Sequence, residues 1–191
     1  MSKTIVCLGD SVTCNWESPS YPEFLQELID QHHLPYQIIN SGINGEIAQD
    51  GYYRLPTDVI AHKPNIVTVM FGHNEIFNGL GVDHWHRYTN LIIQKINHHL
   101  PHSELWLLTP NKVNNKQQAA KYQSLLDTLR QSDDRFSLID IWQEFADQNL
   151  DSIYTDQFGY DGLVGLDWLH PNSKGHLLIA QTLFNKLSKI S

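Results

Sequence analysis

Five short apolar runs are spread along the chain, and each ends at a glycine or another polar or turn-forming residue. Runs this short, rich in β-branched residues, are typical of buried strands. They predict strands at residues 5–8, 36–40, 66–71, 105–108 and 136–141. The run at 66–71 reads IVTVMF, which is apolar on both faces and predicts a central parallel strand covered by helices on both sides.

Between these runs, apolar residues recur at helical spacing. Ser20 and Glu23 form a capping box with Pro22 in the first turn, which predicts a helix start near Ser20. Pro171 is expected at the first position of the last helix. The predicted later helices cover residues 47–61 (a weaker pattern), 82–100, 117–130 and 171–189. Residues 143–166 lack clean periodicity and predict a short helix followed by a surface loop. Strands that alternate with helices predict an α/β fold with a mainly parallel sheet, organised as one domain over residues 1–191.

The charge and cysteine content of the chain limit the binding partners and the cellular location that we expect. The chain has 191 residues, with 13 basic and 21 acidic side chains and a net charge of -8. Because no basic cluster appears, we expect neither a nucleic-acid partner nor stable membrane association. Met1 leads almost directly into the first strand and no apolar run could span a bilayer, so we expect no signal peptide. Cys7 falls in a buried strand and Cys14 in a loop, which predicts two free thiols and a cytoplasmic protein.

Four polar motifs are predicted at one edge of the sheet. GDS (9–11), NSG (40–42) and GHN (72–74) follow the first three strands, and DWLHP (167–171) precedes the last helix. Parallel strands place their carboxyl-terminal loops on the same edge, where open α/β folds bind their ligands. Each motif by itself is also typical of an ordinary turn or helix cap.

Together, these motifs contain the groups that a serine nucleophile requires. Gly9 allows a sharp turn with positive φ that presents Ser11, while His170 can act as the base and Asp167 can orient its imidazole. The alternative is an Asp–His pair that only caps the helix. The backbone N–H groups of Ser11 and Gly42 and the side-chain amide of Asn74 could bind an oxyanion.

In this order, the four motifs resemble those of the SGNH hydrolase superfamily, also called GDSL esterases and lipases, whose four letters match Ser11, Gly42, Asn74 and His170. The resemblance implies a three-layer α/β/α sandwich with a flavodoxin-like, mainly parallel five-stranded sheet. It also implies ester hydrolysis through an acyl-serine, with no metal and no cofactor. The chain departs from the family at Glu75, where the family usually has aspartate.

The predicted function is a serine hydrolase that cleaves a small or medium acyl ester, with oligomeric state left open. The alternatives are an acyltransferase on the same fold and a non-catalytic carbohydrate-binding module. The Gly-x-Ser-x-Gly elbow of the usual α/β-hydrolases is absent around Ser11. The histidines show no zinc-ligand spacing, and His73 is expected to line the pocket at most. Asp161, in an Asp-Gly-Leu run, imitates the family's acid, but Val164 stands where the histidine would follow.

Overall fold

A computed structural model describes residues 2–14, 19–131, 133–150 and 168–190. Over these residues, five strands form one sheet in the order β2-β1-β3-β4-β5, and every neighbouring pair is parallel. This is the flavodoxin-like order. The strands are β1 (Lys3–Gly9), β2 (Tyr36–Gly42), β3 (Ile66–Met70), β4 (Glu104–Leu108) and β5 (Ser137–Ile139).

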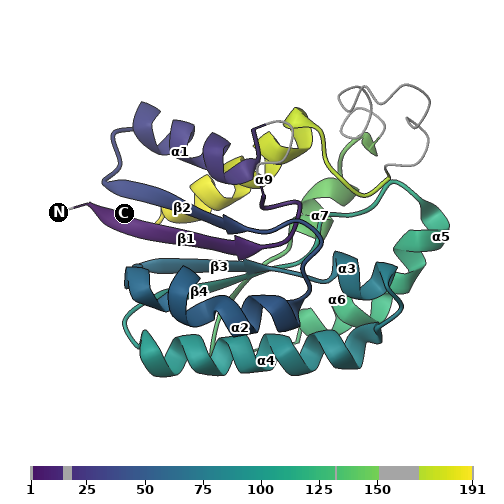
Figure 1. The fold of residues 1–191 in the computed structure, drawn as a ribbon. Helices are drawn as coiled ribbons and strands as arrows, with labels where there is room; N and C mark the ends of the chain where they lie inside the picture. Colours follow the sequence, from purple (N-terminus) through teal and green to yellow (C-terminus); the bar gives the residue numbers. More distant parts are fainter. Residues whose placement is uncertain (1, 15–18, 132, 151–167, 191) are drawn as a thin grey trace.

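Helices cover both faces of the sheet (Figure 1). α1 and α9 lie on one face, and α2 and α4 lie on the other. The helical segments are α1 (Tyr21–Gln31), α2 (Ala48–Asp58), η1 (Ile60–His62), α3 (His73–Phe77), α4 (Gly81–His99), α5 (Lys116–Ala119), η2 (Ala120–Tyr122), α6 (Gln123–Leu129), α7 (Ile141–Ala146) and α9 (Ser173–Leu187). The predicted α/β/α sandwich with a parallel five-stranded sheet is therefore confirmed.

The two apolar cores follow from strand alternation. In β1, Ile5 and Cys7 pack into the core under α1 and α9, while Val6 and Leu8 pack into the core under α2 and α4. Successive strand side chains point to opposite faces, so a strand that is apolar at every position is buried on both sides.

Three helical predictions need correction. The segment predicted as one helix over 117–130 is divided into α5, η2 and α6, with Asn115 capping the first piece. Pro171 is not the first helical residue, because the Asn172 side chain caps α9 by accepting from the N–H groups of Lys174 and Gly175. Residues 73–77, for which no helix was predicted, form the short helix α3.

The strand register sets the position of the site. Gly9 is level with Gly42 on one side and with Met70 on the other, so β1, β2 and β3 end together at one edge. The loops that follow these three strands therefore meet there. Within the described part of the chain, no helix combines the length and the apolar character needed to cross a bilayer.

Candidate active site

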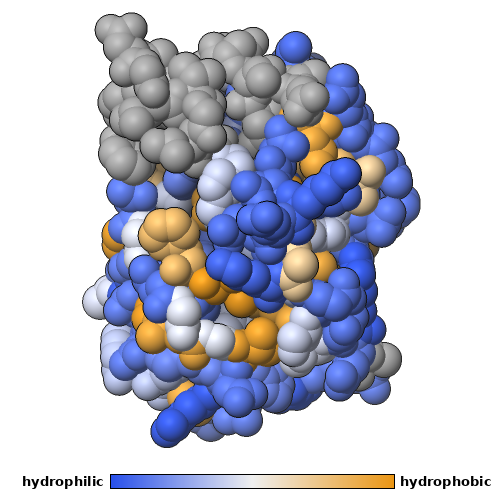
Figure 2. Space-filling view, turned by 90° about the vertical axis from the view of Figure 1, so that its right-hand side faces the viewer, coloured by the Kyte–Doolittle hydropathy of each residue, from blue (hydrophilic) through white to orange (hydrophobic). Residues whose placement is uncertain are grey.

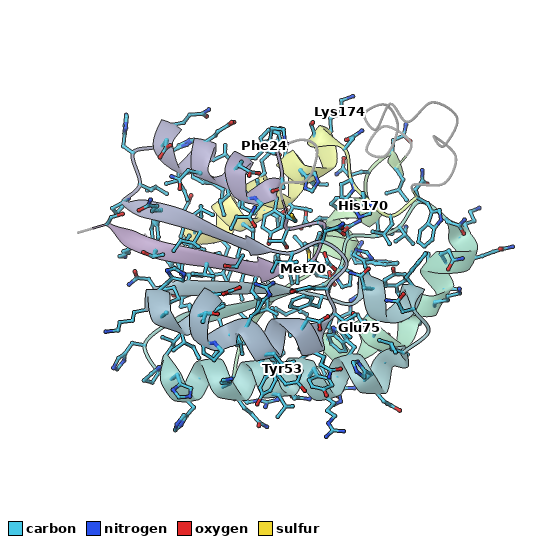
Figure 3. The ribbon with its side chains drawn as sticks, viewed as in Figure 1. Phe24, Tyr53, Met70, Glu75, His170 and Lys174 are labelled. Carbon is cyan, nitrogen blue, oxygen red and sulfur yellow. The ribbon has the colours of Figure 1, made fainter. Side chains whose placement is uncertain are left out.

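Ser11 and His170 meet at the carboxyl edge of the sheet. The Ser11 Oγ atom lies 2.8 Å from His170 Nε2, although the residues are 159 positions apart. Ser11 follows β1, and His170 lies just ahead of α9. Figure 3 shows His170 and Glu75 beyond the end of β3, on the side to which the strands point. A hydroxyl at hydrogen-bond distance from an imidazole nitrogen is the geometry in which histidine can remove the serine proton.

The turn that carries Ser11 is held by Asp10. The side-chain carboxylate of Asp10 accepts from the Val12 N–H at 3.0 Å. The backbone carbonyl of Asp10 accepts from the N–H groups of Thr13 and Cys14. These bonds use the N–H groups that follow Ser11, not that of Ser11 itself. Burial raises the pKa of Asp10 to about 7, and the nearby Glu75 carboxyl contributes to this rise.

The glycine before this turn is required for a different reason than the sequence suggested. The φ angle of Gly9 is not positive, so the tolerance of glycine for positive φ is not used at this turn. A Cβ on Gly9 would lie 2.1 Å from Thr13 Oγ1 and 2.9 Å from the Met70 carbonyl oxygen. Glycine is needed because the turn folds back closely over the end of β1.

The two further oxyanion candidates lie on the neighbouring loops. The Asn74 side-chain amide donates to the Glu46 carbonyl at 2.7 Å, and an amide nitrogen carries two N–H groups, so a second one remains. The Gly42 N–H donates to Asn40 Oδ1 at 2.9 Å. In this structure Gly42 is therefore already engaged, and a ligand oxygen would have to share its N–H with Asn40.

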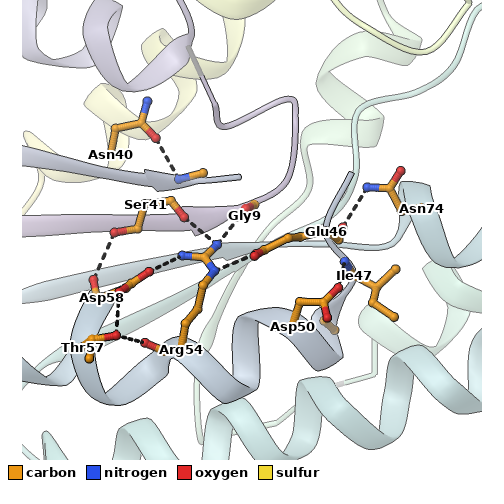
Figure 4. A network of polar contacts seen from close by, with 12 residues as sticks. Gly9, Asn40, Ser41, Glu46, Ile47, Asp50, Arg54, Thr57, Asp58 and Asn74 are labelled. Carbon is orange, nitrogen blue, oxygen red and sulfur yellow. Dashed lines mark hydrogen bonds and ion pairs between the residues drawn. The ribbon is translucent and has the colours of Figure 1, made fainter. Parts of the chain in front are cut away.

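Arg54 joins these loops together (Figure 4). Its guanidinium donates to the carbonyl oxygens of Gly9 at 3.2 Å and Ser41 at 2.7 Å, at the ends of β1 and β2. It also pairs with Glu46 at 2.6 Å and with Asp58 at 3.0 Å. Since the Glu46 carbonyl holds the Asn74 amide, Arg54 supports the oxyanion candidates from α2. Arg54 is not among the site residues predicted from the sequence.

Glu75, the departure from the family pattern, has a defined contact. It is fully buried, and its Oε1 atom accepts from the Ala48 N–H at 2.6 Å, at the start of α2. A carboxylate is favoured at a helix N-terminus by the helix dipole. Burial raises the pKa of Glu75. The longer glutamate side chain thus fastens α3, which carries Asn74, to α2.

His73 does not line the site, because only 1% of its surface is exposed. Its Nδ1 atom lies 2.8 Å from Tyr122 Oη, and its Nε2 atom lies 2.9 Å from Asn111 Oδ1. Asn111 and Tyr122 were not predicted from the sequence, because neither lies in a recognisable motif. Asp167 and the rejected alternative Asp161 lie outside the described residues.

A parallel sheet in this strand order, with a serine–histidine pair at its carboxyl edge, is the arrangement of an SGNH-type α/β protein. The family model for the GDSL-like Lipase/Acylhydrolase family matches residues 7–178, and the chain belongs to that family.

Two curated proteins are similar to part of the chain. The chain is 30% identical over 81 residues to an arylesterase from Vibrio mimicus. The matched region covers 41% of this chain and 40% of the relative. The chain is 34% identical over 76 residues to the uncharacterized lipoprotein YqeF from Bacillus subtilis, covering 37% of this chain and 31% of the relative. These matches span less than half of each relative's length.

Solved structures extend the likeness of fold to nearly the whole chain. The acetylxylan esterase Axe2 from Geobacillus stearothermophilus matches with a TM-score of 0.70 and 17% identity, over 97% of this chain and 94% of that one. At this identity the likeness is one of fold alone.

Proposed function

We propose that this protein is a carboxylic ester hydrolase that cleaves a small or medium acyl ester through an acyl-serine intermediate. The observation that carries the proposal is the 2.8 Å contact between Ser11 Oγ and His170 Nε2. Family membership supports the reaction class. The name of one relative, an arylesterase, is consistent with it.

In the proposed reaction, Ser11 Oγ attacks the ester carbonyl while His170 Nε2 takes the hydroxyl proton. Asp167 would accept from His170 Nδ1–H and keep Nε2 available as the base. The carbonyl oxygen becomes an oxyanion, which the Ser11 N–H and the second N–H of Asn74 can stabilise. We propose Gly42 as a third donor that shares its N–H between Asn40 and the oxyanion. His170 then gives its proton to the departing alcohol, and a water molecule releases the acid by the same steps.

The surface around the site suits an uncharged substrate. Figure 2 faces the carboxyl edge and shows apolar side chains gathered among polar ones on this face. Ile43 follows β2, while Phe77 and Leu80 lie at the end of α3 and just beyond it, and these three side chains are exposed. Exposed apolar side chains that follow β2 and β3 at this edge would favour the acyl or aryl part of an ester over a charged group.

The test is a comparison of Ser11→Ala with Ser124→Ala, which removes an exposed hydroxyl on α6. Wild type and Ser124→Ala should react with a fluorophosphonate probe and hydrolyse p-nitrophenyl acetate and butyrate faster than longer esters. Ser11→Ala should lose both labelling and turnover. Retained turnover in Ser11→Ala would disprove the acyl-serine mechanism.

We also propose the cytoplasm as the location, supported by the free thiols of Cys7 and Cys14. Cell fractionation tests this directly. Recovery of the protein with the membrane fraction, as the lipoprotein name of one relative would suggest, would contradict it.

A further inference from the structure

A buried chain of hydrogen bonds ends at the peptide that precedes His170. His73 contacts Tyr122 Oη through Nδ1 and Asn111 Oδ1 through Nε2, at 2.8 and 2.9 Å. The Asn111 Nδ2 atom then donates to the Leu169 carbonyl at 2.9 Å. The side chains of Tyr122, His73 and Asn111 have at most 1% of their surface exposed. These bonds thus join four segments beside the candidate site: α3, the loop after β4, η2 and the segment before α9.

The direction of each bond follows from the chemistry of the groups. A backbone carbonyl only accepts, so the Asn111 NH₂ group faces Leu169 and its oxygen faces His73. That oxygen also only accepts, so His73 Nε2 carries the proton. Burial lowers the pKa of His73 to about 4, which keeps the ring neutral near pH 7 and leaves Nδ1 as an acceptor. Tyr122 therefore donates to Nδ1, and the direction of each of the three hydrogen bonds is defined.

A second bond holds the preceding peptide. The Asn114 N–H donates to the Trp168 carbonyl at 2.8 Å, so the loop after β4 holds two successive carbonyls immediately before His170. His73 is also the neighbour of Asn74, the oxyanion candidate. The same buried hydrogen bonds therefore hold the peptide before His170, the candidate base, and the residue before Asn74, a candidate oxyanion donor.

We propose that Asn111, oriented by His73 and Tyr122, is a positioning residue that keeps His170 Nε2 at hydrogen-bond distance from Ser11 Oγ. This inference rests on the proposed function. The Asn111 amide fixes the peptide of Leu169, and the direction of that peptide sets where the imidazole of the next residue points. A displacement of about 1 Å in such a group can lower the rate about a hundredfold.

The experiment compares Asn111→Leu and Asn111→Asp with wild type in hydrolysis of p-nitrophenyl acetate. Leucine is similar in size to asparagine and removes the donor. Ionised aspartate keeps the acceptor for His73 but has no proton for the Leu169 carbonyl, and it serves if the leucine variant does not fold. Active sites are titrated with a fluorophosphonate, so that kcat is expressed per competent site. In each folded variant kcat per site should fall about ten- to a hundredfold, while KM stays within about twofold.

Ser103→Ala is the matched control. It removes another side-chain bond to a backbone carbonyl, that of Pro64, at the opposite edge of the sheet just before β4. Its Tm should fall while kcat per site stays at the wild-type value. If the Asn111 variants behave like this control, or change KM without kcat, the positioning role is wrong. Turnover in Ser11→Ala would instead overturn the proposed function itself, so the two failures are distinguishable.

Discussion

Replacing Gly42 by alanine should separate the loop that carries Ser11 from the end of β2. A Cβ on Gly42 would lie 2.3 Å from Cys14 N, 2.5 Å from Thr13 C and 2.8 Å from Cys14 Cα. All three are backbone atoms of the turn that follows Ser11, so no side chain can rotate away. The φ angle of Gly42 is not positive, so lack of space, rather than backbone strain, makes this position intolerant of a side chain.

The size of the effect follows from these distances. Ordinary contacts of a Cβ begin at 3.4 Å, so the turn and the strand must move apart by about 1 Å. Overpacking of this kind costs about 1–3 kcal/mol of stability. The same displacement shifts Ser11 relative to Asn74 and His170, and a shift of about 1 Å can lower kcat about a hundredfold.

The assay measures Tm and kcat per fluorophosphonate-titrated site for Gly42→Ala and for Gly79→Ala. Gly79 has φ +70° and no atom within 4 Å of an added Cβ, so alanine there brings backbone strain without a clash. That strain costs about 1–2 kcal/mol, and the control should lose Tm but keep its kcat. Wild-type kcat in Gly42→Ala, or an equal loss of kcat in both variants, would refute the argument.

Four other changes test separate parts of the site and fold. Asn74→Ala should lower kcat by about 10²–10³ with little change in KM, and an effect confined to KM would mean that Asn74 only holds the substrate. Glu75→Gln should keep most activity, because the amide oxygen can still accept from the Ala48 N–H, and a loss as large as that of Asn74→Ala would contradict this. Asp167→Asn should lower kcat by up to about 10⁴ while Asp161→Asn stays near wild type, and the reverse result at the same pH would move the acid to Asp161. Burial lowers the pKa of His176 to about 3, whereas the pKa in the unfolded chain is about 6.5. Between these two pH values the unfolded chain binds more protons than the folded one, so the free energy of unfolding falls as the pH drops below about 6.5. His176→Leu should therefore show a smaller fall in Tm between about pH 7 and about pH 4, and an unchanged fall would disprove the linkage.

The strands and their common edge were predictable because they depend on local pattern. The all-apolar run at 66–71 indicated a strand buried on both faces, and β3 (Ile66–Met70) is fully buried. Ser20 and Glu23 indicated the start of α1, and the Ser20 N–H donates to the Glu23 carboxylate at 2.6 Å. Such signals act over a few residues and need no knowledge of the rest of the fold.

Predictions that depended on contacts between distant segments were less complete. The residues 117–130 have helical periodicity, yet Tyr122 is fully buried against His73 and Trp142, and the segment is divided around it. Pro171 was a reasonable first helical residue from propensity alone, but the Asn172 side chain caps α9 instead. In both places local propensity allowed more than one arrangement, and the contacts that form one of them appear only in the folded chain.

The sequence by itself determined the fold class and which side chains could carry the chemistry, because periodicity and motif order are properties of the linear chain. Only the tertiary structure decided that Ser11 meets His170 across 159 positions, and that Asn111 reaches Leu169 across 58. It also decided that residues 9 and 42 must be glycine, because the turn at Thr13 and Cys14 packs directly against both of them. The identity of a residue indicates what it can donate, accept or exclude, whereas its partner is set by the packing of every element between them.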